Sequence, residues 1–535
     1  MNSKINFGKE SRDQIKTGVD TLANAVKVTL GAAGRNVIIQ YENQFPQITK
    51  DGVTVARSIT CENPISNMGS ELIKEIAQKT NEQAGDGTTT ATILAQAIIT
   101  EGLKNIASGS NPMYLKKGID KAVKLVVEYL KIMADPVGDY NNIAKIASIS
   151  ANNDMEIGNL IAEAIKLVSK DGVITIEEAK GVDTTVEVVE GMQFEKGYLS
   201  PYFVTDTTKM EVIYDNPYIL LCSKRITSIQ ELLPIMEKIV RAKKPLILIV
   251  DELDAEALQM LIINKIKGTL QVCAVKSPNY GQIRKDYMDD IAIMTGGKVI
   301  NPELGMTLDN IDFDDLGEAK KVIINQNSTT IIGGLGDKEK LKERIDIIKY
   351  QADNCKSSFD EEQLRERISK LSGGIGVIYV GGSSEIDIRE RKDRFEDAIN
   401  ATRAAVAEGI IPGGGLALLH CSMYLTKKAI KRLNCKNEDE ILGVKLIGKI
   451  IEEPFKQIIM NAGDNPEVVL SEINKHKKFT DYGYNVDTER YERFLETGVI
   501  DPVKVSRVAL ENAASIAGLL LTTECVIFNK KEDIK

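Results

Sequence analysis

Residues Ala84 to Asn105 read AGDGTTTATILAQAIITEGLKN. Two glycines flank Asp86, threonines follow, and apolar residues then recur at helical spacing through Ile93, Leu94 and Ile98. Glycines ahead of a helix let the backbone turn free N–H groups toward an anion. Asp86 is suited to hold Mg²⁺ against phosphate oxygens, because Mg²⁺ prefers one or two carboxylates plus phosphate. The stretch predicts a phosphate-binding turn that opens a helix; an ordinary turn with a Thr N-cap is the alternative.

Two further loops precede this stretch. Thr29 to Asn36 read TLGAAGRN, and Lys50, Asp51 and Gly52 form a Lys-Asp-Gly run. The first loop either supplies more backbone donors or caps the helix before it, because Gly is common just past a helix end. The chain contains neither a Walker A pattern nor a GxGxxG that opens a βαβ unit. Any phosphate chemistry here must therefore use a different cradle.

Composition narrows the class of protein. The chain has 535 residues and a net charge of -9, which argues against a nucleic-acid binder, since that would need clustered Lys and Arg. Seven scattered cysteines without a CxxC pair, and only two histidines, make a zinc site, a disulfide framework or a Ser/His/Asp triad improbable. A signal peptide is not expected, because the amino terminus, MNSKINFGKES, has no apolar h-region. A membrane span is not expected either, because the apolar run Leu246–Val250 is far too short. We expect a cytoplasmic protein in a reducing compartment.

The pattern of apolar residues divides the chain into three parts. The first 130 residues and the last third have helical periodicity, and the middle, from about Gly191 to Ser372, alternates β-prone runs with amphipathic helices, which is typical of an α/β domain. Short strands are expected at 37–40, 53–56, 246–250, 272–275 and 322–325, and helices at 394–407 and 503–521. The charged stretch 338–370 is expected to be a long solvent-exposed helical segment or a hairpin.

Taken together, the motifs have a specific order along the chain. They are TLGxxGRN, ITKDGVTVA at 48–56, the stretch at 84–105, ISAN at 149–152, VVEGMQFEKGYLSPYF at 188–203, EDAINATRAAVAEG at 396–409, PGGG at 412–415, DYGYN at 481–485, GVIDPVKV at 498–505 and LLLTTEC at 519–525. In this order they closely resemble the group I chaperonins, the bacterial 60-kDa type, over residues 4–527. The resemblance implies a multidomain α/β chaperonin fold. Its parts would be a mostly helical equatorial ATP-binding domain at 1–132 and 408–535, a small intermediate hinge domain at 133–189 and 376–407, and an α/β apical domain at 190–375.

The resemblance also implies a function and its partners. Such proteins bind ATP with Mg²⁺ and K⁺ and use its hydrolysis to encapsulate and refold non-native polypeptides. They form two stacked seven-membered rings and work with a small heptameric lid co-chaperonin. Neither nucleic acid nor a membrane is an expected partner.

Site residues carry over position by position from the resemblance. The predicted nucleotide contacts are Thr29, Leu30, Gly31, Ala32, Lys50, Asp86, Gly87, Thr88, Thr89, Thr90, Gly414, Asn485, Val486, Asp487 and Asp501. Asp86 would hold Mg²⁺, and Thr29 and Lys50 would lie at the K⁺ site. Asp51 and Asp397 match the two carboxylates that orient and activate the attacking water. Asp397 lies on the intermediate domain of the family fold, so we expect it to reach the nucleotide only after a hinge closes.

Two apolar helical segments, 229–241 and 256–267, carry the expected substrate-binding face. Each is apolar over more than one stripe, although part of each must pack into the core. The residues that match the family's cavity-mouth hydrophobics are Tyr198, Tyr202, Phe203, Leu233, Met236, Leu258, Ile262 and Ile263. The same face would bind the mobile loop of the lid.

Departures from the family pattern leave two alternatives open. Ala32-Ala33 replaces a Pro-Lys pair, Val486-Asp487 replaces two small residues, 276–285 differs from the usual apical sequence, and the Gly-Gly-Met-rich tail is missing. A binding protein that keeps the fold but has lost ATP turnover is the first alternative. An unrelated small-molecule phosphotransferase that uses GDGTTT is the second.

Overall fold

The computed structural model describes residues 3–40, 46–137, 140–151, 154–168, 173–179, 181–207, 209–301, 305–355, 357–425, 432–476 and 478–529. The chain folds into two compact units. The helical unit comprises residues 1–162 and 393–535, and the sheet unit comprises residues 163–392. The two ends of the chain therefore fold together, as the resemblance implied. The division into three domains remains a prediction.

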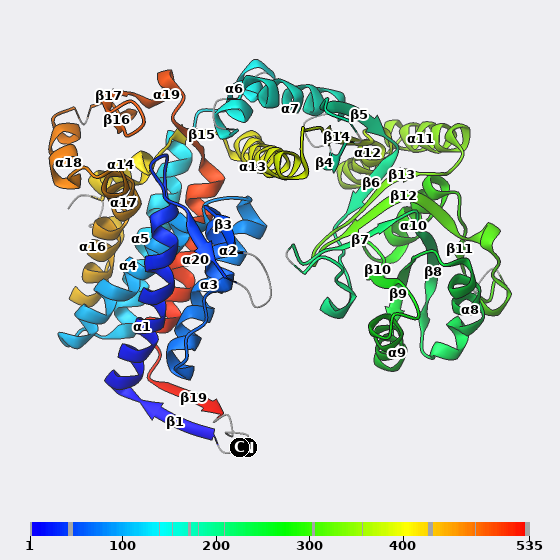
Figure 1. Cartoon of the computed structure of the whole chain (residues 1–535), viewed down its shortest axis with the longest axis horizontal. Helices are drawn as coiled ribbons and strands as arrows, with labels where there is room; N and C mark the ends of the chain where they lie inside the picture. The colour runs from blue at the N-terminus through cyan, green and yellow to red at the C-terminus, as the bar shows by residue number, and fades with distance from the viewer. Residues whose placement is uncertain are drawn as a thin grey trace. The chain divides into compact units, whose positions relative to one another are not determined.

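Long helices that lie side by side build the helical unit (Figure 1). They are α1 (Gly8–Val26), α3 (Pro64–Ala84), α4 (Thr88–Ala107), α5 (Pro112–Met133), α16 (Glu438–Ile450) and α20 (Val503–Leu521). Shorter helices surround them: α2 (Gly52–Ser58), α6 (Tyr140–Ser150), α14 (Leu416–Tyr424), α17 (Glu453–Ala462), α18 (Pro466–Lys475) and α19 (Phe494–Thr497). Two helices, α7 (Met155–Val168) and α13 (Glu385–Glu408), contain the boundaries between the units.

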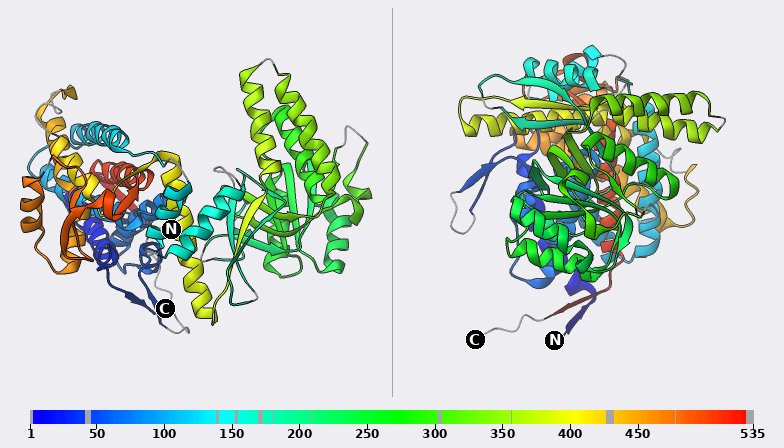
Figure 2. Two further views of the ribbon diagram at one scale, coloured as in Figure 1. Left: turned by 90° about the horizontal axis from the view of Figure 1, so that it is seen from above. Right: turned by 90° about the vertical axis from the view of Figure 1, so that its right-hand side faces the viewer.

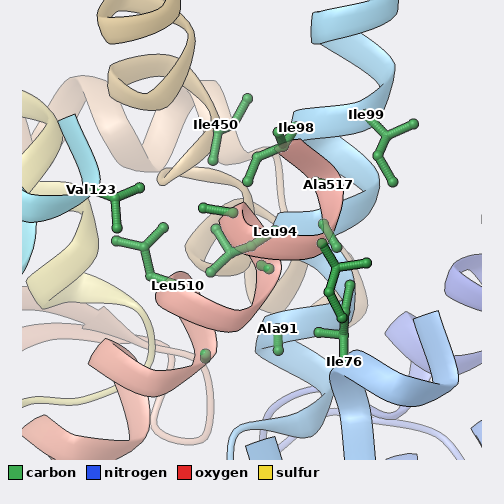
Figure 3. Close-up of a cluster of buried hydrophobic side chains, with 14 of the residues drawn as sticks. Ile76, Ala91, Leu94, Ile98, Ile99, Val123, Ile450, Leu510 and Ala517 are labelled. Carbon is green, nitrogen blue, oxygen red and sulfur yellow. The ribbon is translucent and has the colours of Figure 1, made fainter. Parts of the chain in front are cut away.

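The core of the helical unit centres on α4. Leu94 and Ile98 are fully buried, and Leu510 of α20 and Val123 of α5 pack in the same cluster (Figure 3). Burying a side chain of this size contributes about 1.5–3 kcal/mol, so the cluster fixes α4 firmly. A helix held this way gives its first turn a rigid position.

Two-stranded ribbons complete the helical unit. The pairs are β1 (Ser3–Phe7) with β19 (Cys525–Asn529), β2 (Val37–Ile39) with β3 (Gln47–Thr49), β15 (Ile410–Pro412) with β18 (Ile500–Pro502), and β16 (Tyr482–Asn485) with β17 (Arg490–Arg493). The strand expected at 53–56 is wrong, because these residues lie in α2. The Asp51 side chain accepts hydrogen bonds from the N–H groups of Val53 and Thr54, which starts a helix there.

An eight-stranded mixed sheet forms the middle of the sheet unit. The strand order is β10-β9-β8-β12-β13-β6, with β11 beside β8 and β7 beside β12. The strands are β6 (Gly191–Phe194), β7 (Val212–Asp215), β8 (Tyr218–Ile226), β9 (Leu246–Leu253), β10 (Val272–Lys276), β11 (Val299–Ile300), β12 (Gly317–Ile324) and β13 (Thr329–Gly334). The three strands expected in this region are confirmed. A separate three-stranded sheet has the order β4 (Val173–Glu178), β14 (Ile375–Val380), β5 (Thr185–Val189).

Helices cover the large sheet and form one hairpin. They are α8 (Leu233–Ala242), α9 (Ala255–Ile266), α10 (Gly281–Thr295), α11 (Lys338–Asp353) and α12 (Ser358–Ser372). The predicted hairpin is confirmed, because α11 and α12 run side by side (Figure 2). Buried Asp290 of α10 accepts hydrogen bonds from Arg344 of α11 and Arg367 of α12, which ties the hairpin to the sheet. Asn152 of the ISAN motif and the chain end beyond Asn529 lie outside the described residues.

Candidate nucleotide site

The predicted glycine turn joins α3 to α4. Gly85 ends α3 with φ 74° and Gly87 is the N-cap of α4 with φ 83°. Both angles lie in the left-handed region, which glycine enters without the steric cost that other residues meet. Because Gly87 occupies the N-cap, the alternative of a Thr N-cap is wrong. The turn leaves Asp86 at its apex, directly before the helix.

The first turn of α4 has the features of an anion site. The leading N–H groups of a helix have no partner within it and form the positive end of its dipole. Gly87 has no side chain to cap them, and its own N–H donates to Asp86 Oδ1 at 2.5 Å. Thr88, Thr89 and Thr90 supply the first-turn N–H groups and three hydroxyls. This arrangement can bind a phosphate oxygen from several directions.

The Lys50-Asp51-Gly52 loop lies against this helix start. A Cβ added to Gly52 would lie 2.4 Å from Thr89 Oγ1, so the two segments are in close contact. The Asp51 carboxylate accepts hydrogen bonds from the N–H groups of Val53, at 3.2 Å, and Thr54, at 2.8 Å, and from the Thr54 hydroxyl at 2.6 Å. These donors hold one carboxylate beside the threonine turn. Lys50, next in the chain, is exposed.

Asp397 approaches the same turn from α13. Ala404, on this helix, packs with Ala84, Val505 and Val508 in one buried cluster. Burial, and then the charges of Asp86 and Asp51 among others, raise the pKa of Asp397 to about 7. Asp397 therefore lies near the turn in this structure. The hinge closure that the resemblance implies stays a prediction.

A third chain segment adds Asp501 and Gly414. Asp501 lies on β18, opposite Ile411 of β15, and the Gly414 N–H donates to its carboxylate. Burial and then the charge of Asp86 raise the pKa of Asp501 to about 7. Asp86 and Asp501 are therefore near neighbours across the site.

These carboxylates form one acidic site at the start of α4. Asp86 and Asp397 are exposed to solvent in this structure, yet desolvation by the surrounding protein atoms is the largest cause that raises their pKa values. Neighbouring acids raise the pKa values of Asp86, Asp397 and Asp501 further. A bound cation would relieve this repulsion.

The acidic site fits Mg²⁺ bound together with phosphate. Within the described residues, no group of three or more His, Cys, Asp or Glu side chains is arranged to hold a metal alone. Mg²⁺ commonly takes one or two carboxylates and completes its shell with phosphate oxygens and water. Asp86 at the apex of the turn, beside the free N–H groups of α4, suits that arrangement.

The other predicted nucleotide residues lie on neighbouring loops. Thr29 belongs to the 3₁₀ turn η1 (Lys27–Thr29), which contacts α4, and Leu30, Gly31 and Ala32 follow it. The Thr29 hydroxyl donates its hydrogen to the carbonyl of Val26 at 2.9 Å, so this hydrogen already has an acceptor within the protein.

The residues predicted to border the adenine lie at the end of β16 and in the turn that leads to β17. The Asn485 amide donates to Glu492 Oε1 at 2.6 Å, and its Oδ1 accepts from the Asp487 N–H at 3.0 Å. Val486 packs against a buried cluster that includes Phe494. A Cβ added to Gly414 would lie 3.7 Å from the Phe494 ring, so this hairpin borders the Gly414 side of the site.

The predicted apical face divides into surface and core. Tyr202 and Leu233 are exposed, by 67% and 45%. Leu258, Ile262 and Ile263 of α9 are half-buried. Tyr198, Phe203 and Met236 are buried in the core of the sheet unit, so they offer no accessible surface in this structure.

Sequence reasoning missed three apolar residues that are exposed on the same two helices. They are Val240 of α8, and Met260 and Ile266 of α9. Ala257 and Leu261 mark the buried side of α9, so the helical period could have assigned Ile266 to the opposite side, whereas Met260 lies on its flank. Asn400 of α13, which approaches Gly85, was also missed, and no sequence signal identifies it.

No helix in the portion of the chain that the structure covers has the length and apolarity needed to cross a membrane.

Comparison with solved structures defines the class of fold. The chaperonin gp146 from the bacteriophage EL 2 (Pseudomonas aeruginosa), crystallised in the presence of ATP-BeFx, matches with a TM-score of 0.68 at 22% sequence identity. The match covers 98% of this chain and 99% of that chain. This likeness shows the multidomain α/β chaperonin fold, which confirms the fold expected from the sequence.

Family membership then follows from the sequence. The model of the TCP-1/cpn60 chaperonin family matches residues 22–531, so the chain belongs to this family. The expected chaperonin of the group I type is confirmed. The chain is a molecular chaperone of protein folding, and the alternative of an unrelated phosphotransferase is wrong.

Proposed function

We propose that this chaperone binds ATP at the acidic site at the start of α4 and couples its hydrolysis to the refolding of non-native polypeptides. The observation that carries the proposal is that Asp51, Asp86 and Asp397, from three separate segments, gather at one helix N-terminus. A structural role alone does not explain three mutually repelling carboxylates beside free backbone donors. The TCP-1/cpn60 membership is consistent with this activity.

Each part of the acidic site has a role in the proposed reaction. The N–H groups and hydroxyls of Thr88, Thr89 and Thr90 bind phosphate oxygens, and Asp86 holds Mg²⁺. The metal, when bound, neutralises charge on the phosphates. Asp51 and Asp397 orient a water molecule that attacks the γ-phosphorus while the bond to the bridging oxygen of ADP breaks. A pKa of about 7 suits Asp397 to accept the proton of that water near neutral pH.

Further contacts complete the proposed nucleotide site. Gly414 lies against the nucleotide, Asp501 binds the ribose, and Asn485 to Asp487 border the adenine. Thr29 and Lys50 mark the K⁺ site. The Thr29 hydroxyl donates its hydrogen to the Val26 carbonyl, which leaves the lone pairs of its oxygen for a cation.

One variant tests the hydrolysis directly. In Asp397→Asn, we expect ATP to bind within about threefold of the wild-type affinity and turnover to fall by about 10²-fold or more. Fluorescent-nucleotide titration and phosphate release measure the two quantities. Wild-type turnover in the variant would overturn the role of Asp397. Absence of turnover in the wild-type chain, with binding intact, would favour the alternative of a chaperone that has lost ATP cycling.

The apolar surface of the sheet unit is the proposed client site. Tyr202, Leu233, Met260 and Ile266 are exposed, and apolar side chains gathered at one surface suit the exposed hydrophobics of unfolded chains. The lid co-chaperonin would compete for the same residues through a mobile loop. Binding of a denatured client that a lid homologue displaces would support both assignments.

Two exposed ribbons support a homo-oligomer. Ile38 and Ile48 pair across β2 and β3, Ile5 and Ile527 pair across β1 and β19, and all four are more than half exposed. Apolar pairs on open ribbons are suited to pairing with another chain. We propose two stacked seven-membered rings with equatorial, intermediate and apical domains at the boundaries given above; electron microscopy of the purified protein tests this. The seven cysteines are free thiols, and we propose the cytoplasm.

A further inference from the structure

Asn400 of α13 contacts the turn that carries Asp86. A Cβ added to Gly85 would lie 2.5 Å from Asn400 Cβ, 2.8 Å from its Cγ and 3.2 Å from its Nδ2. Real Cβ atoms do not approach other carbons this closely, so Gly85 is a glycine partly because Asn400 occupies the space. The φ of 74° at Gly85 also favours glycine, because other residues rarely adopt this left-handed conformation.

Asn400 shares one helix face with two other residues at the site. Asp397 lies three residues before it and Ala404 four residues after it, and such spacings place side chains on the same face of a helix. Ala404 packs against Ala84 and Val505. Asp397 lies within the electrostatic reach of Asp86 and Asp51. Asn400 is therefore the middle contact between a packed end of this face and the carboxylate.

We propose that Asn400 is a positioning residue, whose packing on Gly85 sets the place of Asp397 over the Asp86 turn. The inference rests on the proposed ATP hydrolysis and deepens it. Asn400 acts through Asp397, so its loss changes the geometry of the attacking water and leaves the phosphate cradle of α4 intact.

The contact with Gly85 indicates that Asn400 positions Asp397 by packing and not by hydrogen bonding. The two atoms of Asn400 closest to the Gly85 position are carbons, Cβ and Cγ. Leu has almost the same shape as Asn but lacks its polar atoms. Asn400→Leu therefore keeps both carbon contacts and removes the amide, while Asn400→Ala keeps the Cβ contact and loses the contact that Cγ makes.

Steady-state ATPase kinetics and hydrogen exchange of the nucleotide-free, full-length protein test the proposal. For Asn400→Ala, we expect kcat to fall about 10-fold, because small misplacements of a catalytic group are costly, with KM for ATP changed less than about twofold. Amide exchange at 396–404 should become faster. For Asn400→Leu, we expect kcat within about twofold of the wild type and wild-type exchange.

Two outcomes would overturn the positioning role. The first is that Asn400→Ala leaves both kcat and exchange unchanged. The second is that Asn400→Leu is as inactive as Asn400→Ala while its exchange stays normal, since the amide would then act on the nucleotide itself. Asp397→Asn is assayed in parallel. If that variant remains active, the proposed hydrolytic mechanism fails, whereas the exchange result for Asn400→Ala still reports on the contact.

Discussion

Asp397, on α13, lies close enough to Asp86, in the turn before α4, for the charge of Asp86 to raise the pKa of the Asp397 carboxyl. More than 300 residues of sequence separate the two acids. Their proximity costs stability, because like charges repel in a partly desolvated place. Such a cost is expected where a site is arranged for a cation and a phosphorylated ligand.

The repulsion predicts how stability depends on pH. A carboxyl whose folded pKa is about 7 stays protonated in the folded chain while the unfolded chain is already ionised above about pH 4. The unfolded state then binds fewer protons, so stability falls as pH rises through this window. Asp397→Asn should stabilise the nucleotide-free protein at about pH 8 by about 1 kcal/mol, a figure kept small because solvent screens the exposed side chain.

Urea unfolding midpoints near pH 8 and about pH 3 measure this effect. The gain should be largely lost at the lower pH, where Asp397 is mostly protonated in both states. Asp314→Asn, at an exposed acid of the sheet unit, is the matched control and should show no such gain. A gain of equal size at both pH values would contradict the electrostatic explanation.

Asp51 combines a structural and a proposed catalytic role, and two variants separate them. Its carboxylate caps α2. Asn caps as well as Asp, whereas Ala costs about 1 kcal/mol. Asp51→Asn should keep the unfolding midpoint of the wild type, and Asp51→Ala should lower it. Both should lose ATP turnover. Normal turnover in Asp51→Asn would show that Asp51 serves only as a cap.

Gly87→Ala should distort the phosphate turn for two reasons. Ala at φ 83° costs about 1–2 kcal/mol, and its Cβ would lie 2.7 Å from Val505 Cγ1. We expect ATP affinity to fall by about 10-fold or more, measured by nucleotide titration. Adding Val505→Ala should recover part of this loss, because it removes the clash but leaves the φ strain. Gly109→Ala, at φ 103° with open space around it, is the control that carries strain alone and should bind ATP normally.

Adjacent residues in the sheet unit should respond in opposite ways to substitution. Tyr202 is exposed and Phe203 is fully buried. Tyr202→Ser should weaken capture of a denatured client several-fold and change the free energy of unfolding by less than about 0.5 kcal/mol. Phe203→Ala should cost about 3–5 kcal/mol, because it leaves a cavity in the core. Client binding unchanged in Tyr202→Ser would remove this residue from the proposed surface.

The sequence predicted the long helices well, because their apolar period extends over many turns. Residues 503–521 were expected as a helix and form α20 with those bounds. The error at 53–56 has a physical cause. Four residues are too few to distinguish the two periods, and Asp51, just before them, decides the outcome by capping a helix.

Other features depend on contacts between distant segments, so they could not be predicted from the periodicity of the sequence. The burial of Phe203 beside exposed Tyr202 depends on the sheet beneath them. The approach of Asn400 to Gly85 depends on the packing of α13. The resemblance supplied Asp51, Asp86 and Asp397 as site residues, but it gave no indication that Asn400 approaches Gly85.

The pairing of β1 with β19 has a consequence for synthesis. Ser3 pairs with Asn529, and α4 and α20 share one core, so the helical unit cannot close until almost the whole chain has emerged. At about 5–20 residues per second, α4 waits roughly 20–80 s for α20. The contiguous sheet unit can fold meanwhile. During that interval, the apolar surface of α4 is open to aggregation, so a newly made subunit of this chaperone is itself a candidate client of finished ones.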